Sequence, residues 1–175
     1  AFEKCMLLNA IEFKYDSQLL LIDKNAFYNS SIKMILVPSL VIKIGSNAFQ
    51  HSNQLQNVFF TKDSQLEIID SYSFCNTGIT NISIPSSVSC IGERAFSNCL
   101  NLNWIDILEN SKLKIIQKYA FSHSSLICIS LPSILANIEE YTFYNCQKLV
   151  YIEINEKLSL SLMDQDKKSK MKKRV

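Results

Sequence analysis

Residues 79–99, ITNISIPSSVSCIGERAFSNC, decide the fold of this chain. Ile82 and Ile84 alternate with polar residues directly before Pro85, a pattern that is typical of a short strand with one buried side. Ile91 then precedes the pair Ala95-Phe96, in which a small residue stands before an aromatic one. This second segment predicts a tight helical or 3₁₀ turn on the opposite side of the unit.

The same arrangement returns along the chain. The pattern Ile-x-x-x-(Ala/Ser/Thr)-Phe occurs six times, and Phe2 supplies a seventh anchor. The anchors are Phe2, Phe27, Phe49, Phe74, Phe96, Phe121 and Phe143. Their separations alternate between 25 and 22 residues, which gives a double period of 47. A unit of this size cannot bury its own apolar face, so we expect the units to stack around one continuous core.

The two kinds of unit differ where the strand ends. Short units carry a proline there, at Pro38, Pro85 and Pro132, and a proline after a strand removes no donor from the ladder. Long units lack the proline, insert one residue and add a second apolar group, such as Leu66 to Ile69. Stacking predicts that equivalent strands pair in a parallel sheet, about 4.8 Å apart.

These residues resemble the BspA-like (Treponema pallidum-type) leucine-rich repeats, whose pattern is close to L-x2-I-x-(I/L)-P-x-S-V-x2-I-G-x-x-A-F-x-x-C. The best match is residues 79–99, and the resemblance covers residues 1 to about 163. The fold expected is an α/β leucine-rich-repeat solenoid, with a parallel β-sheet on one face and short turns, 3₁₀ or helical segments on the other. We predict seven units over residues 1–163, followed by a basic, disordered tail at residues 164–175.

Composition excludes several classes of function. The glycines Gly45, Gly78 and Gly92 stand alone, so no glycine-rich loop can cradle a phosphate. No apolar run approaches the roughly 18 residues of a membrane span. Six of the eight residues 167–174 are basic, but the net charge of +2 gives the body no matching positive patch. We therefore expect neither a nucleic-acid partner nor a membrane span.

The two histidines invite a metal or catalytic interpretation, which the repeat does not favour. His51 and His123 stand two residues after an anchor phenylalanine. Other units carry these residues there: Lys4, Asn29, Asn76, Asn98 and Asn145. Asparagine and histidine are both enriched in left-handed backbone conformations, so the position predicts a turn. Three units separate the histidines by roughly 15 Å, too far for one metal ion.

The cysteines also follow the repeat. Cys5, Cys99 and Cys146 stand three residues after an anchor, and Ser52 holds that position in the fourth long unit. They would lie roughly 10 Å apart or more, beyond the reach of a disulfide, and are interpreted as small buried groups. Cys75, Cys90 and Cys128 fall in three other phases. A Cys–His pair or a disulfide between adjacent turns stays an alternative, but we expect no catalytic, cofactor or metal site.

The sheet face offers a candidate binding surface, because its outward positions do not contribute to the core. These positions flank the central strand residue in two rows. The partner-binding candidates are Met34, Leu36, Asn57, Phe59, Asn81, Trp104, Asp106, Tyr151 and Glu153. Aromatic anchors with polar surroundings are typical of a protein-contact surface. Scattered exposed apolar residues are also normal in proteins, which is the alternative interpretation.

The resemblance implies a non-enzymatic protein–protein recognition module. BspA-like repeats are characteristic of surface proteins, which implies adhesion to host or matrix proteins and a location at the cell surface or outside the cell. The alternative is an intracellular, cytoplasmic scaffold whose repeats dock against neighbouring subunits of a larger assembly.

Overall fold

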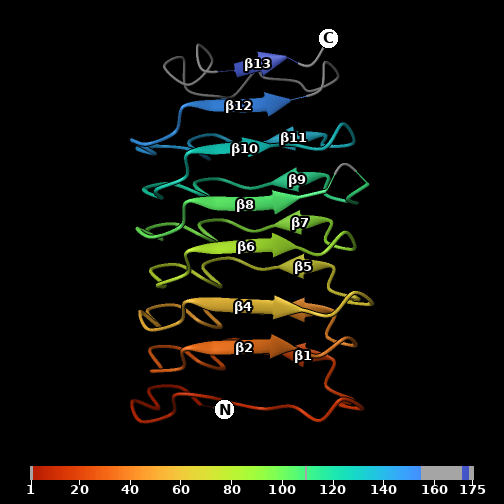
Figure 1. The fold of residues 1–175 in the computed structure, drawn as a ribbon, viewed down its shortest axis with the longest axis vertical. Helices are drawn as coiled ribbons and strands as arrows, with labels where there is room; N and C mark the ends of the chain where they lie inside the picture. Colours follow the sequence, from red (N-terminus) through yellow and green to blue (C-terminus); the bar gives the residue numbers. More distant parts are fainter. Residues whose placement is uncertain (1, 109, 155–170, 174–175) are drawn as a thin grey trace.

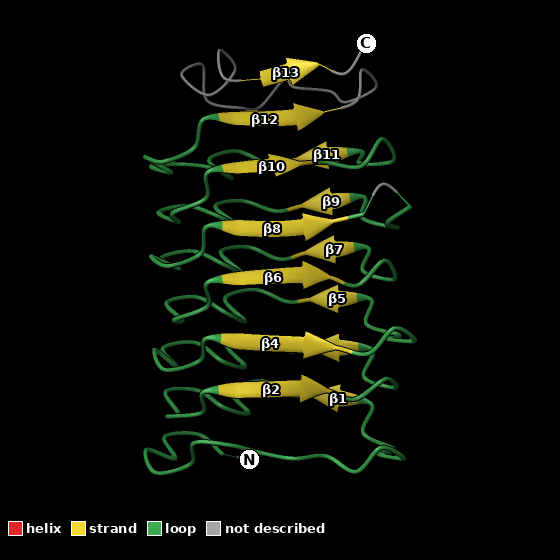
Figure 2. Cartoon of the chain, viewed as in Figure 1, coloured by secondary structure: helices red, strands yellow, loops and turns green. Residues whose placement is uncertain are grey.

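The computed structural model of the chain describes residues 2–108, 110–154 and 171–173. These residues form a stack of coils along the longest axis of the molecule (Figure 1). Most coils have a longer strand on one side, called the front here, and a two-residue strand on the other side, called the back (Figure 2). The front and back arrows point in opposite directions (Figure 1). The prediction of a repeat solenoid with parallel strands is confirmed.

The front strands pair in parallel along the stack. They are β2 (Met34–Val37), β4 (Asn57–Phe60), β6 (Asn81–Ile84), β8 (Trp104–Ile107), β10 (Cys128–Ser130), β12 (Tyr151–Ile154) and β13 (Met171–Lys173). Hydrogen-bonded pairs are β2 with β4, β6 with β8, β10 with β12 and β12 with β13. β4 also lies beside β6, and β8 beside β10. In the first unit, the described front segment makes an isolated bridge from Ala10 to Met34.

The back strands form a second parallel sheet, with the order β1-β3-β5-β7-β9-β11. They are β1 (Leu21–Ile22), β3 (Lys43–Ile44), β5 (Ile68–Ile69), β7 (Cys90–Ile91), β9 (Ile115–Ile116) and β11 (Asn137–Ile138). Each ends on the buried isoleucine of the repeated signature. Because isoleucine is β-branched, it favours extended backbone and packs well when its equivalents stack in register. The prediction of a β-sheet on one face was therefore incomplete, because the opposite face also carries a parallel sheet.

The turns around the anchor phenylalanines are not helical. Within the described residues there is no helix, so the α/β class and the helical or 3₁₀ turn are not confirmed. Left-handed residues stand two positions before and two positions after the anchor, as with Asn47 (φ 58°) and His51 (φ 64°) around Phe49. A helix needs consecutive right-handed residues, so this spacing interrupts it. The predicted turn position of His51 and His123 is confirmed.

The turns carry their own column of hydrogen bonds from coil to coil. The N–H of Phe49 donates to the Ser73 carbonyl at 2.7 Å, and the N–H of His51 donates to the Cys75 carbonyl at 3.0 Å. The next anchor repeats the arrangement, since the N–H of Phe74 donates to the Ala95 carbonyl at 2.8 Å. The backbone groups of the turn are thus satisfied by the neighbouring coil, as buried backbone groups must be.

The seven anchor rings form one column through the interior. Consecutive ring centroids lie 5.0 to 5.6 Å apart, and all six pairs are stacked. Phe49, Phe74, Phe96 and Phe121 are inaccessible to solvent, whereas Phe2, at the N-terminal end of the column, is 41% exposed. The prediction that equivalent side chains share one interior is confirmed.

The position three residues after each anchor holds a small hydrogen-bond donor under the turn. Ser52 Oγ donates to the Phe27 carbonyl at 2.6 Å, and Cys99 Sγ donates to the Phe74 carbonyl at 3.1 Å. Cys146 does the same toward Phe121 at 3.0 Å. A hydroxyl and a thiol can exchange here because each satisfies the carbonyl of the preceding anchor. The repeat predicts small buried groups at this position, and the structure adds their hydrogen bonds to the anchor carbonyls.

The boundary between solenoid and tail stays a prediction, because residues 155–170 and 174–175 lie outside the described part of the chain. Within the predicted tail, Met171–Lys173 form β13, and Met171 pairs with Ile152.

Replacing an interior anchor should cost far more stability than replacing the terminal one. Phe96 is buried between Phe74 and Phe121, so Phe96→Ala should lower the free energy of unfolding by about 3–5 kcal/mol. Phe2→Ala is the matched control and should cost less, because Phe2 is partly exposed and stacks on one ring. Urea denaturation measures both losses. Equal losses would contradict a continuous aromatic core.

Thiol labelling should follow burial. All six cysteines are free in the structure. Burial raises the pKa of the Cys99 thiol to about 11, and it also raises the pKa of the Cys75 and Cys90 thiols. At about pH 8, iodoacetamide should therefore label Cys99 slowly in the folded protein, because the thiolate is the nucleophile. Denaturant should make all six react alike, as peptide mass spectrometry would show. Rapid native labelling of Cys99 would count against this packing.

Candidate functional site

The outward side chains of the front strands form two parallel rows. The inward residue of each strand, such as Ile35, Ile82 or Ile105, is buried, so its neighbours on the strand face solvent. The first row is Met34, Asn57, Asn81, Trp104, Cys128 and Tyr151, and of these Cys128 is buried. The second row is Leu36, Phe59, Ser83, Asp106, Ser130 and Glu153.

All nine predicted partner-binding residues occupy these rows. Six of them are exposed: Met34, Leu36, Asn57, Phe59, Asn81 and Trp104. Asp106, Tyr151 and Glu153 are half-buried. Phe60, which could have exchanged roles with Phe59, packs against the core, and Phe59 is the outward ring. The structure therefore places the candidates on one face, and their role in binding stays a prediction.

The apolar candidates near the N-terminal end of the front gather into one patch, named here the N-terminal patch. It consists of Met34 and Leu36 on β2 and Phe59 on β4. Leu36 and Phe59 are register partners, so their side chains lie next to each other on neighbouring strands. Phe59 is 49% exposed. Three large apolar side chains thus meet solvent in adjacent coils.

A second set of exposed apolar residues, named here the C-terminal patch, lies at and just before the start of β8, β10 and β12. It consists of Trp104, Ile127 and Val150, and Trp104 is 53% exposed while Val150 is 64% exposed. The N–H of Val150 donates to the Ile127 carbonyl at 2.8 Å, and the N–H of Ile127 donates to the Asn103 carbonyl at 3.2 Å. Ile127 and Val150 were missed because they directly precede β10 and β12, outside the two predicted rows.

Polar side chains separate the two patches. Asn81 and Ser83 on β6 lie in the coil between Phe59 and Trp104, and Asn57 stands beside Phe59 on β4. Two coil steps therefore separate Phe59 from Trp104, about 10 Å at strand spacing. Near the C-terminal patch, the hydrogen bond with Cys128 raises the pKa of Tyr151 above its ordinary value. The front face therefore presents two apolar patches with an uncharged polar strip between them.

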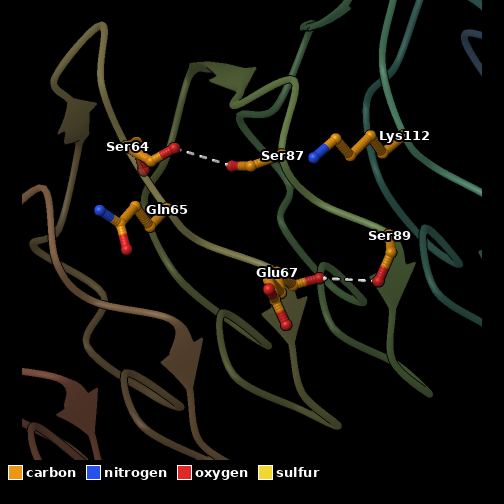
Figure 3. A pocket seen from close by; sticks show the side chains of 6 residues that line it. All are labelled: Ser64, Gln65, Glu67, Ser87, Ser89 and Lys112. Atoms are coloured by element: carbon orange, nitrogen blue, oxygen red, sulfur yellow. Dashed lines mark hydrogen bonds between the residues drawn. The ribbon is translucent and has the colours of Figure 1, made fainter.

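A polar groove of about 510 Å³ lies away from this face (Figure 3). It is lined by Ser64, Gln65, Glu67, Ser87, Ser89 and Lys112. Ser87 Oγ donates to the Ser64 carbonyl at 2.9 Å, and Ser89 Oγ donates to the Glu67 carbonyl at 3.2 Å, as the dashed lines in Figure 3 show. The serine hydroxyls therefore hold neighbouring coils together. The lining includes neither a histidine nor a cysteine, and the hydroxyls of Ser87 and Ser89 are engaged by backbone carbonyls.

The two histidines likewise have structural partners. His51 Nδ1 shares a hydrogen bond with Asn76 Nδ2 at 2.7 Å, and His123 Nδ1 shares one with Asn145 Nδ2 at 2.9 Å. Residues 2–108, 110–154 and 171–173 contain no group of three or more His, Cys, Asp or Glu side chains that could hold a metal ion. Over the same residues, no helix has the length and apolar character needed to span a membrane.

Comparisons with known proteins agree with this architecture. A family model described as the BspA type leucine-rich repeat region matches residues 1–79 and 67–163, with six copies. A search of curated proteins finds no match.

Among solved structures, the chain is similar to the pneumococcal vaccine antigen PcpA, with a TM-score of 0.74 and 26% identity over 79% of this chain and 36% of that one. It is also similar to a leucine-rich cell surface protein from Faecalibacterium prausnitzii (TM-score 0.57, 21% identity, 77% of this chain and 42% of that one). The T. pallidum leucine-rich repeat protein TpLRR shares the fold (TM-score 0.54, 21% identity, 77% of this chain and 52% of that one).

The chain thus spans between about a third and a half of these neighbours. The family match covers nearly all of the described coils, and the neighbours share their fold. This chain belongs to the BspA-type leucine-rich repeat family, whose repeats form a protein-interaction module.

Proposed function

We propose that the front face recognises a protein ligand through the N-terminal and C-terminal patches. The observation that carries this proposal is the exposure of Phe59 and Trp104 at outward strand positions. Asn57, Asn81 and Ser83 hold equivalent positions in neighbouring coils, so the fold itself does not require an aromatic ring there. Exposed apolar patches mark interaction sites, and aromatic residues are enriched among binding hot spots.

The separation of the two apolar patches favours a protein ligand over a small molecule. The two patches are separated by a polar strip, and neither lies in an enclosed cavity of the kind that small molecules occupy. A protein surface or an extended segment can bridge both patches, burying the apolar side chains while the polar strip forms the surround. Tyr151, Asp106 and Glu153 extend the contact toward the C-terminal end of the face, as the sequence analysis predicts.

We further propose that the ligand is a host-cell or matrix protein and that the chain acts in adhesion at the cell surface. The similarity to a vaccine antigen and to a cell surface protein supports this proposal. The chemistry of the described residues fits a non-catalytic role, since the Cys99 thiol is held protonated by burial and both histidines are engaged in the turns. The intracellular scaffold has no observation in its favour and is not proposed.

Substitutions borrowed from neighbouring coils can test the face without disturbing the fold. Phe59→Ser and Trp104→Asn introduce residues that the same rows already hold at Ser83 and Asn81. Together they should weaken binding to immobilised collagen or fibronectin at least tenfold, in line with the loss of two aromatic anchors, about 1–2 kcal/mol or more each. Surface plasmon resonance measures the affinity.

Leu21→Ala is the matched control, because Leu21 is an exposed apolar residue on the back sheet. It should leave the affinity unchanged. Trp104, the single tryptophan of the sequence, also reports contact directly through its fluorescence. Retention of full affinity by the double variant would reject the front face as the binding surface. Failure of every matrix protein to bind would instead reject adhesion and leave the face to be tested with another protein ligand.

A further inference from the structure

The edge formed by the anchor turns carries an unexpected row of large side chains. The left-handed position two residues before each anchor holds Asn25 and Asn47 in two coils. In the next four coils it holds Tyr72, Arg94, Tyr119 and Tyr141, all with φ between 52° and 59°. Asparagine tolerates this backbone conformation well, whereas bulky residues adopt it rarely and at a cost. The turn alone therefore does not call for tyrosine or arginine here.

Arg94 shows what this edge can bind. Its Nη1 lies 2.6 Å from Glu93 Oε1 and donates to the Tyr72 hydroxyl at 2.7 Å. Its guanidinium carbon lies 4.5 Å from the centre of the Tyr119 ring and 5.6 Å from that of Tyr72. A guanidinium is thus held by a carboxylate, a phenol oxygen and an aromatic face, each of which is a favourable partner for it.

The same three kinds of group gather at the C-terminal end of the edge. The rings of Tyr119 and Tyr141 are stacked with centroids 5.0 Å apart. Tyr144 stands nearly perpendicular to both, at 6.3 Å from Tyr119 and 6.0 Å from Tyr141. Tyr141 and Tyr144 are both exposed.

A polar depression lies at the residues just before Tyr141. Glu139 and Glu140 precede Tyr141, and with Lys118 and Asn137 they line a depression of about 310 Å³. Lys118 Nζ pairs with Glu140 Oε2 at 3.2 Å, which offsets one negative charge. Glu139 Oε2 accepts a hydrogen bond from the backbone N–H of Lys118 at 2.9 Å. The depression is therefore lined by two carboxylates and one ammonium group.

We propose that Tyr141, Tyr144 and Glu139 bind an arginine side chain of a protein partner. The rings of Tyr119 and Tyr141 are too close to admit a group between them, so the guanidinium lies against the exposed sides of Tyr141 and Tyr144. Glu139 supplies the carboxylate, as Glu93 does for Arg94, because the repeat equivalent of Glu93 is Glu140, which is paired with Lys118. Arginine is the fitting ligand because its planar guanidinium stacks on rings and bonds a carboxylate through two N–H groups, which the ammonium of lysine cannot reproduce. This site lies on the turn edge and does not depend on the front face.

A matched pair of synthetic peptides tests the proposal on the full chain. One peptide alternates glycine with arginine, and the other alternates glycine with lysine at the same length and charge. Isothermal titration at low ionic strength should show the arginine peptide binding at least threefold more tightly. Tyr141→Asn combined with Tyr144→Ser should weaken its binding about fivefold, the scale of cation–π contacts at exposed sites. Glu139→Gln should weaken it as well.

Both tyrosine substitutions preserve the turn, because Asn47 and Ser122 hold the equivalent positions in other coils. Tyr28→Gln is the matched control: Tyr28 lies on the same edge, packs against His51 and has Gln50 as its equivalent. It should leave the affinity unchanged, as should Trp104→Asn on the front face. Equal affinity for the two peptides, no detectable binding, or an unchanged affinity in the tyrosine double variant would overturn the proposal.

Discussion

The structure depends on the stacking of equivalent residues from coil to coil. The column of anchor rings supplies the apolar part of this contact, and the backbone bonds of the turns and of both sheets supply the polar part. A single coil has neither, since its anchor would lack neighbouring rings and its turn N–H groups would lack acceptors. Sequence positions therefore have meaning only relative to the neighbouring units. This is why both candidate surfaces consist of rows that run across coils.

The sequence was sufficient to predict the solenoid, its core and the outward positions of the front face, because each depends on the repeat period and on alternation along a strand. The back sheet was missed since its strands are two residues long, too short to show alternation, as at Ile68–Ile69. The absence of helix in the described coils was missed for a different reason. The left-handed residue before the anchor is asparagine in some coils and tyrosine in others, so residue type gave no consistent signal.

The alternation of inward and outward residues along the strands could identify Phe59 and Trp104 as exposed, but it could not identify their neighbours. Ile127 and Val150 continue the column of Asn103, the residue before Trp104, at positions just before the strands, where no alternation applies. The environment of Arg94 was similarly invisible, because its partners Tyr72 and Tyr119 lie in the preceding and following coils. Such neighbourhoods become predictable once the units are aligned on their anchors and compared column by column.

The alternation of long and short coils sets a rule for how such a protein can change its length in evolution. Deleting or duplicating one coil would bring two coils of the same kind together and mismatch donors such as Ser52 and Cys99 with their carbonyl partners. Deleting or duplicating a pair of coils, which together contain 47 residues, restores every partner at the new junction. Gene duplication in steps of two coils would therefore lengthen the molecule by about 10 Å at a time. The distance between surface features along the stack would therefore change only in steps of two coils.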